Sequence, residues 1–167
     1  MKNLFYFITL AFLLTSCGGY QSASSDNEND NFEIVNDMVF WRYVYDESMD
    51  IDKLKQNPKL DFETDTTGFI IRTNFNDKQL KDLTGEFKIQ SKGDRYRVSV
   101  FNVVFYTEPM TLNSGGLGMQ TISEHTIEES LIKDNGQMRK SFWGYNLTAI
   151  LNPHLINLFK AIKLSLG

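Results

Sequence analysis

The chain has 167 residues, of which 41% are hydrophobic and 23% charged, so it is long enough to bury one ordinary core. Its formal net charge of −4 at pH 7 argues against nucleic acid as a partner, because nucleic-acid binding needs clustered Lys and Arg. The single cysteine excludes an intrachain disulfide and a cysteine-based zinc or iron–sulfur site, so stability must come from packing.

Residues 1–16 have the outline of a signal peptide, with Lys2 near the start and an apolar or aromatic run over Leu4–Leu14 that only Thr9 interrupts. A membrane helix needs roughly 20 apolar residues, so this run is too short to remain as one. The sequence from Leu14 to Gly18, Leu-Thr-Ser-Cys-Gly, resembles the bacterial lipobox. That resemblance implies that signal peptidase II cuts before Cys17 and that its thiol is acylated. The alternative is a buried structural cysteine.

Residues 17–35 are predicted to be the lipidated cysteine and a disordered tether, because the stretch up to Asn31 has almost nothing apolar to bury. A coil of this length holds the domain on the order of 20 Å from the lipid on average, and about 50 Å at full stretch. Diacylglycerol with an amide-linked chain should anchor it stably. Gly18 does not match the aspartate that retains some lipoproteins in the inner membrane, which favours the outer membrane. Its periplasmic and surface faces both stay open.

The first predicted strand is Met38–Tyr45. Because the side chains of a strand alternate between its faces, three aromatic residues share one face: Trp41, Tyr43 and Tyr45. If exposed, this row would suit sugar rings. The favoured interpretation is that the row belongs to the core, with the polar tips of Trp41 and Tyr43 reaching hydrogen-bond partners.

Three short elements are predicted next. Ser48 or Asp50 caps a short helix that carries Ile51 and Leu54, and Asn57-Pro58 ends it, since proline disfavours helical geometry in the residue before it. A second strand covers Gly68–Asn74, and Asp77–Leu83 is predicted to form a helical turn.

The clearest local signal is a hairpin between Glu86–Gln90 and the central strand Gly93–Tyr106, because polar and apolar residues alternate in both. A tight turn at Lys92-Gly93 is expected, since glycine accepts a positive φ. This turn pairs Gln90 with Arg95, Lys88 with Arg97, and Glu86 with Ser99. One face is then polar and solvent-exposed near the turn, and Val98 faces a packed helix. From Phe101 onward the strand is apolar on both sides except at Asn102, which predicts cover on both faces.

The rest of the chain is predicted to hold a loop and helices. Glu108-Pro109 ends the central strand, and Ser114–Gly118 is a glycine-rich loop that lacks the Lys-Ser/Thr of a phosphate-binding loop. A capping box at Thr126–Glu129 opens a short helix, and a second helix is expected over Gln137–Leu151. The last helix is predicted to start at Asn152-Pro153 and to lie across the sheet with one apolar stripe: Leu155, Phe159, Ile162 and Leu166.

The sequence offers few candidate catalytic residues. The two histidines are His125 and His154, and a metal site of His125 with Glu128 and Glu129 is less favoured than a solvated charged face. No Gly-x-Ser-x-Gly elbow occurs. Acidic pairs suited to a glycosidase, such as Asp46 with Glu47 and Asp50 with Asp52, are common on any acidic surface. We expect no metal and no cofactor.

Four short segments are similar to a domain of unknown function found in Bacteroidota lipoproteins and secreted proteins: Phe40-Trp41, Gly68–Ile71, Gly93–Val98 and Phe105-Tyr106. The similarity covers about residues 36–166. It implies a TATA-binding-protein-like fold, a curved antiparallel sheet backed by helices, and it implies neither DNA binding nor particular catalytic residues.

The sequence therefore predicts a single α+β domain over residues 36–167, with an antiparallel sheet of about four or five strands and helices packed on one face. The predicted function is that of a lipid-anchored lipoprotein of the cell envelope with a non-catalytic binding or structural role. Its partners would be membrane lipid through Cys17 and an envelope protein or glycan. The alternatives are a carbohydrate-binding accessory lipoprotein that uses the Trp41 and Tyr43 face, and a small envelope hydrolase.

Overall fold

The structure, a computed structural model, describes residues 31–106, 110–111, 120–121, 124–139 and 146–160. It is an α+β arrangement dominated by one antiparallel sheet of seven strands in the order β1-β2-β6-β5-β4-β3, with β9 paired to β6 beyond the end of β2. The strands are β1 (Phe32–Val35), β2 (Met38–Tyr45), β3 (Leu60–Phe62), β4 (Thr67–Thr73), β5 (Asp82–Lys92), β6 (Arg95–Tyr106) and β9 (Glu124–Thr126). The helices are α1 (Ile51–Lys55), α2 (Ile127–Leu131) and α3 (Leu147–Leu158), and β7 (Met110–Thr111) pairs with β8 (Gln120–Thr121).

The sheet has more strands than the four or five predicted. The additional strands β1, β3 and β9 are three or four residues long, too short to show a clear alternation in the sequence. β1 also corrects the predicted tether, because residues 32–35 belong to the sheet. Phe32 is buried against the core, and Asn36 and Asp37 both have positive φ, as a two-residue type I′ hairpin turn to β2 requires.

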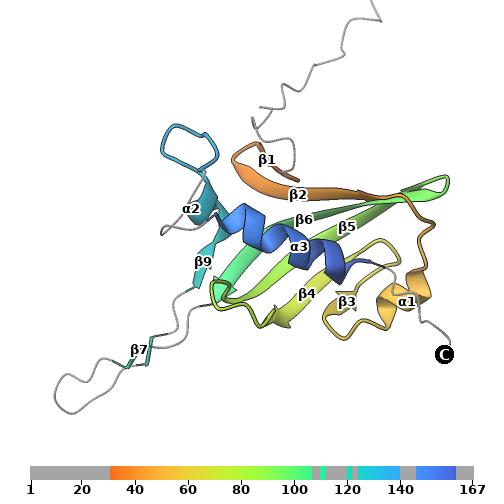
Figure 1. Cartoon of the computed structure of the whole chain (residues 1–167), viewed down its shortest axis with the longest axis horizontal. Helices are drawn as coiled ribbons and strands as arrows, with labels where there is room; N and C mark the ends of the chain where they lie inside the picture. Colours follow the sequence, from red (N-terminus) through yellow and green to blue (C-terminus); the bar gives the residue numbers. More distant parts are fainter. Residues whose placement is uncertain (1–30, 107–109, 112–119, 122–123, 140–145, 161–167) are drawn as a thin grey trace, which may run out of the picture.

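Helix α3 lies across one face of the sheet (Figure 1), and the core fills the space between them. The inward side chains of β5 and β6 alternate with outward ones, so Phe87, Ile89, Tyr96 and Val98 are each at most 1% exposed. Their partners on α3 include Leu151 and Leu155, which are fully buried. Among the described residues, no helix covers the opposite face, which we call the outer face.

The β5–β6 hairpin confirms the predicted faces but corrects the register. Lys92 pairs with Arg95, so the turn residues are Gly93 and Asp94, and Gln90 pairs with Arg97 instead of Arg95. Gly93 carries the positive φ of 61° at the first turn position, which favours this two-residue connection. The shift of two residues keeps every side chain on its predicted face, because the alternation has a period of two.

A β-bulge at Asn102, where φ is 51°, interrupts the central strand. Val98 and Val100 point inward before the bulge, whereas Val103 and Phe105 point inward after it. The apolar run that predicted cover on both faces therefore contains a change of phase, and its outward members are only half-buried. The neighbouring β4–β5 pairing shifts register between Ile70 and Thr73, and paired bulges of this kind bend a sheet.

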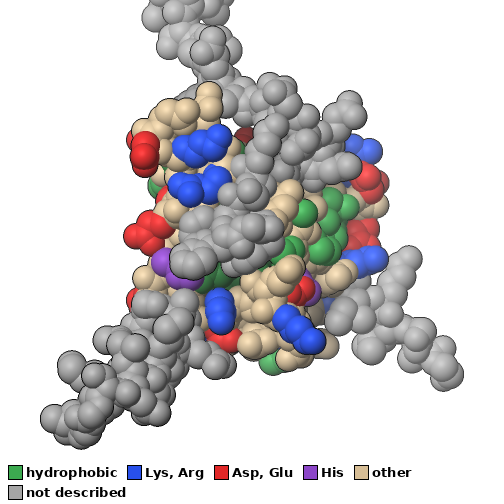
Figure 2. Space-filling model, turned by 60° about the vertical axis from the view of Figure 1, so that its left-hand side comes forward, with side chains coloured by type: hydrophobic (Ala, Val, Ile, Leu, Met, Phe, Trp, Pro, Cys, Tyr) green, Lys and Arg blue, Asp and Glu red, His purple; other side chains and the backbone are tan. Residues whose placement is uncertain are grey.

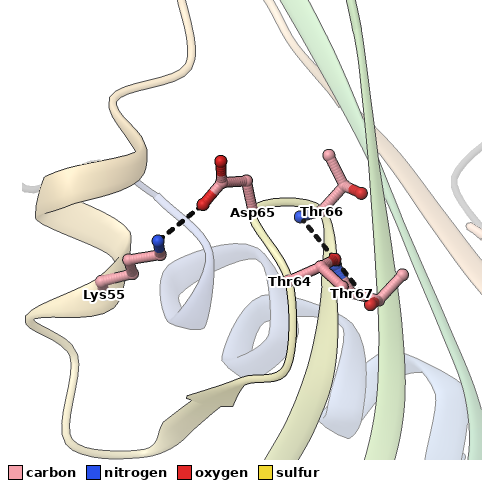
Figure 3. A network of polar contacts seen from close by, with 5 residues as sticks. All are labelled: Lys55, Thr64, Asp65, Thr66 and Thr67. Carbon is pink, nitrogen blue, oxygen red and sulfur yellow. Dashed lines mark hydrogen bonds and ion pairs between the residues drawn. The ribbon is translucent and has the colours of Figure 1, made fainter.

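Helix α1 confirms the prediction of a short capped helix, because the Asp50 side chain accepts a hydrogen bond from the Lys53 backbone N–H. It contacts β3, and Figure 3 shows how the β3–β4 turn is held beside it. The Thr64 hydroxyl accepts from the backbone N–H groups of Thr66 and Thr67, and the Lys55 ammonium lies 2.7 Å from the Asp65 carboxylate. These contacts fix the turn locally.

Residues 77–83 do not form the predicted helical turn as a whole. The Leu80 backbone N–H donates to the Asp77 carbonyl in a single turn, and Leu83 belongs to β5, where it is fully buried. Pairing with Phe105 of β6 gives Leu83 a place in the core that an isolated turn would not provide.

Helix α2 has the predicted capping box, in which Thr126 and Glu129 each accept a hydrogen bond from the other's backbone N–H. Helix α3 differs from the prediction. It is capped by Asn146, and Pro153 lies inside it instead of at its first position. Proline removes the bond to the Ala149 carbonyl, and both residues are on the exposed side, where water can hydrate that group.

Several predictions fall on residues outside those described. These are the signal peptide and Cys17, the end of the central strand at Glu108-Pro109, the Ser114–Gly118 loop, residues 140–145 of the predicted 137–151 helix, and Ile162 and Leu166 of the apolar stripe. The start of the 137–151 helix is wrong, because residues 137–139 are not helical and Met138 forms a β-bridge with Ile132. The described members of the stripe, Leu155 and Phe159, are both fully buried.

Candidate functional site

The aromatic row on β2 lies under α3, in agreement with the favoured core interpretation, so Trp41 and Tyr45 are not available as ligand-facing residues. Trp41 is 1% exposed and Tyr45 5% exposed, whereas Tyr43 is half-buried between their rings. The Tyr43 ring centroid lies 6.0 Å from that of Trp41 and 4.7 Å from that of Tyr45. Burial under the helix leaves no face of Trp41 open for a sugar ring.

The polar tips of Trp41 and Tyr45 are paired with α3, which confirms the predicted partner for Trp41. The Trp41 indole N–H donates to the Asn152 side-chain oxygen at 2.8 Å, and the Tyr45 hydroxyl donates to the Ile156 carbonyl at 2.8 Å. Burial raises the pKa of Tyr45 far above its ordinary value, with neighbouring Tyr96 adding to the effect, so the hydroxyl stays a proton donor. The row therefore fastens the helix to the sheet.

The outer face of the sheet carries an exposed apolar band. Val44, Phe69 and Ile71 are 48%, 40% and 47% exposed, which makes them the large apolar side chains that are most open to solvent among the described residues. Phe40, on the same strand as Val44, and Phe101 of the neighbouring β6 are half-buried with ring centroids 5.5 Å apart. These side chains leave part of the outer face apolar.

Beside the apolar band lies a group of three cationic side chains that we call the basic cluster: Arg42, Lys88 and Arg97. Arg42 and Lys88 both pair with Ser99, from the two neighbouring strands, and Arg97 is two residues from Ser99 on β6 itself. The short Ser99 side chain is only 9% exposed in this setting. Desolvation by burial and the nearby Arg97 charge both lower the pKa of Arg42.

The sequence indicated a polar, solvent-exposed face near the hairpin turn, and Lys88, Gln90 and Arg97 are exposed there. It did not indicate the basic cluster, because Arg42 comes from a strand more than 40 residues away in the chain. The sequence did contain one signal for the cluster, the alternation of polar and apolar residues in each strand. This alternation places all three cations on the same face once β2 is known to pair with β6.

At the far end of the outer face, around Arg72, the charged side chains neutralise one another. The Arg72 guanidinium lies 4.4 Å from the Tyr106 ring centroid and 3.1 Å from the Asp82 carboxylate, which also accepts a hydrogen bond from the Asn74 amide. Each charge in this group has its counter-charge within the group. It therefore offers a ligand less than the basic cluster does.

The two histidines lie on different elements and serve packing. His125 on β9 stacks on Phe105, and burial lowers its pKa below the ordinary value although Glu129 acts in the opposite direction. His154 on α3 stacks on Phe75 and lies 3.5 Å from the Asp77 carboxylate. In the described part of the chain, no group of three or more His, Cys, Asp or Glu side chains is arranged to hold a metal ion.

The acidic pairs considered for a hydrolase are also engaged. Asp46 forms an ion pair with Arg95, and Asp50 caps α1, where hydrogen bonds from Lys53 lower its pKa. A shallow depression of about 530 Å³ lies here, lined by residues 47–53, which come from one loop and the first turn of α1. A catalytic acid would need a raised pKa, whereas the shift at Asp50 has the opposite sign.

Figure 2 shows a further side of the molecule, on which acidic and basic side chains are interspersed around a hydrophobic area. This side has no field of one sign. None of the helices that the structure describes is long and apolar enough to cross a bilayer.

Comparison with known proteins gives no family to which the chain can be assigned. No family model, no curated protein and no solved structure matches it.

Proposed function

We propose that the protein is a lipid-anchored lipoprotein of the cell envelope, held in the outer membrane through Cys17, whose folded domain has a non-catalytic binding role at the outer face of its sheet. The lipobox resemblance at Leu14–Gly18 supports the anchor. We also propose the TATA-binding-protein-like arrangement implied by the family resemblance. The bulged antiparallel sheet with α3 on one face supports it.

The outer face is the observation that carries the binding role. Three large apolar side chains are 40% exposed or more on this face, next to the basic cluster, while the other face is sealed by α3. A face that served only to fold the chain would be expected to alternate to polar residues throughout, as the solvent side of an antiparallel sheet commonly does. Val44, Phe69 and Ile71 depart from that pattern.

The two alternative functions have less support. The glycan alternative was based on Trp41 and Tyr43, of which Trp41 is sealed and Tyr43 is stacked between rings. The hydrolase alternative was based on two acidic pairs, in which Asp50 caps a helix and Asp46 forms an ion pair with Arg95.

The anchor is tested by growing cells on a clickable fatty acid. The wild-type chain should become labelled and partition into detergent, and the Cys17→Ala variant should do neither, because the acylated thiol is gone. Equal labelling of the two chains would refute the anchor.

The binding role is tested by the accessibility of single cysteines in intact envelopes. Gln90→Cys places a thiol on the outer face without removing a cation, and Ala149→Cys places a matched thiol on the exposed side of α3. If the outer face is occupied, Gln90→Cys should react with a maleimide several times more slowly in envelopes than in purified protein, while Ala149→Cys should not change. Equal reactivity of both thiols in both settings would argue for an unoccupied outer face.

A further inference from the structure

The basic cluster has more positive charge than its own chain neutralises. Arg42 pairs with Glu33, and the Asp46 carboxylate is taken by Arg95 at the same end of the sheet. Within the described part of the chain, Arg97 donates to the neutral amide oxygen of Gln90 and forms no ion pair. Lys88 has no ion-pair or hydrogen-bond partner among the described residues.

Glu86, two residues from Lys88 on the same face of β5, accepts a hydrogen bond from Asn102 at 2.9 Å and keeps its negative charge. Even when Glu33 and Glu86 are both counted, the three cations of the cluster outnumber the two carboxylates. The cluster therefore keeps an excess of positive charge in a chain whose net charge is −4. Such an excess on one face is complementary to an anionic surface.

The exposed cations of the cluster, Lys88 and Arg97, carry donors that suit phosphate. The guanidinium of Arg97 is especially suited, because its planar array of N–H groups matches phosphate oxygens. Arg42 is half-buried, its guanidinium packs over the Phe40 ring at 4.9 Å and its Nε atom is shielded from solvent, so it contributes positive charge and not an open donor at that atom. The three cations surround Ser99 from three neighbouring strands.

An exposed aliphatic side chain stands directly beside the cations. Val44 pairs with Arg97 across the strands, and it is 48% exposed. Cations with an adjacent apolar side chain match the boundary of a bilayer, where phosphate groups lie above the acyl chains.

The point at which the chain enters the sheet lies at the same place. The Arg42 backbone N–H donates to the Asn31 carbonyl at 2.7 Å, so the segment that leads from Cys17 joins the fold beside the basic cluster. The 14 residues from Gly18 to Asn31 span at most about 50 Å, which keeps the domain close to the anchored lipid. Because the tether supplies a high effective concentration, a weak intrinsic affinity for lipid is enough.

We propose that the basic cluster of the outer face, Arg42, Lys88 and Arg97 around Ser99, docks the domain on the anionic phosphate headgroups of the membrane surface. The inference rests on the proposed lipid anchor, since the anchor places this face within reach of the bilayer. Docking would hold the sheet against the membrane and turn α3 away from it.

The test uses vesicles and the chain from residue 17 onward with Cys17→Ala, so that no acyl chain contributes. Binding to phosphatidylglycerol–phosphatidylcholine vesicles should exceed binding to pure phosphatidylcholine vesicles and should fall as salt is raised. Each Lys or Arg near an anionic surface contributes about a fivefold factor in partitioning. The double variant Lys88→Gln/Arg97→Gln should therefore bind about 25-fold more weakly.

The matched control is Lys53→Gln/Lys55→Gln, which removes the same charge from α1 at exposed positions. It should stay within about twofold of the parent, because its cations are not on the outer face. Equal losses for the two double variants would overturn the site, since net charge alone would explain the binding. Circular dichroism and melting temperature confirm that the variants are folded.

The same assay distinguishes lipid from other anionic ligands. Docking on lipid would be overturned if inorganic phosphate bound at millimolar concentration while vesicles did not bind. It would also be overturned if polyglutamate bound more tightly than anionic vesicles. Failure of vesicle binding leaves the fatty-acid labelling of Cys17 untouched, and loss of that labelling leaves vesicle binding by the unacylated chain measurable. The two proposals can therefore fail separately.

Discussion

Replacement of Asn152 tests how α3 is fastened to the sheet. Its side-chain oxygen accepts from the Trp41 indole N–H and from the Asn31 amide, both at 2.8 Å. Asn152→Ala leaves the indole N–H buried without an acceptor, because Trp41 is 1% exposed, and an unpaired buried donor costs about 1 to 3 kcal/mol. Alanine returns up to about 0.7 kcal/mol of helix propensity. The half-buried Asn31 amide can turn to water.

The net loss in the free energy of unfolding should be about 1 to 2 kcal/mol, which corresponds to a fall in melting temperature of about 4 to 8 °C for a domain of this size. Urea unfolding of the Cys17→Ala chain measures it. Asn152→Asp keeps an acceptor oxygen and should lose less. In a Trp41→Phe background the indole donor is absent, so Asn152→Ala should cost at least about 1 kcal/mol less there. If Asn152→Ala costs the same in both backgrounds, the indole hydrogen bond does not fasten the helix.

Three further predictions concern strand phase, capping and pH. Val98→Asp buries an unpaired charge at a fully buried position and should cost several kcal/mol, whereas Arg97→Asp on the outer face should cost under about 1 kcal/mol; equal falls in melting temperature would contradict the strand phase. Thr126→Ala should cost about 1 kcal/mol in urea unfolding through loss of the α2 cap, and Thr126→Ser should cost much less. Because burial lowers the pKa of His125 in the folded state, the unfolded chain takes up the proton first, so this contribution to stability is present above about pH 6.5 and is lost as pH falls. His125→Phe should flatten the decline in melting temperature between about pH 7 and pH 5, and an unchanged slope would refute the assignment.

The β5–β6 hairpin shows how far local pattern reaches. Alternation in the sequence placed Val98 inward and Arg97 outward, and both placements are confirmed, because the period of a strand depends only on its own backbone. The register was wrong by two residues. The choice between Lys92-Gly93 and Gly93-Asp94 as the turn depends on pairing along the whole of both strands, which no short window contains.

The bulge at Asn102 is a second feature that local sequence pattern does not predict. The positive φ of Asn102 creates the bulge that moves the inward set from Val98 and Val100 to Val103 and Phe105. An apolar run on both sides looks like a strand covered on both faces, since neither residue type nor spacing reports a change of phase. The bulge forms where β4, β5 and β6 bend together, and that bend is a property of the sheet.

The sequence by itself determined the α+β class, the inward faces of the long strands and the helix cap at Thr126, and it narrowed the cap of α1 to Ser48 or Asp50, because these depend on residues within a few positions of one another. Only the tertiary structure decided which surfaces are buried and which are exposed. Asn152 was expected to cap a helix, and it instead pairs with Trp41 from 111 residues away. Arg42 reaches Lys88 and Arg97 through β6. Which aromatic residues are sealed and which cations gather are set by strand order and by the position of α3, and both are long-range consequences of burying one face of the sheet.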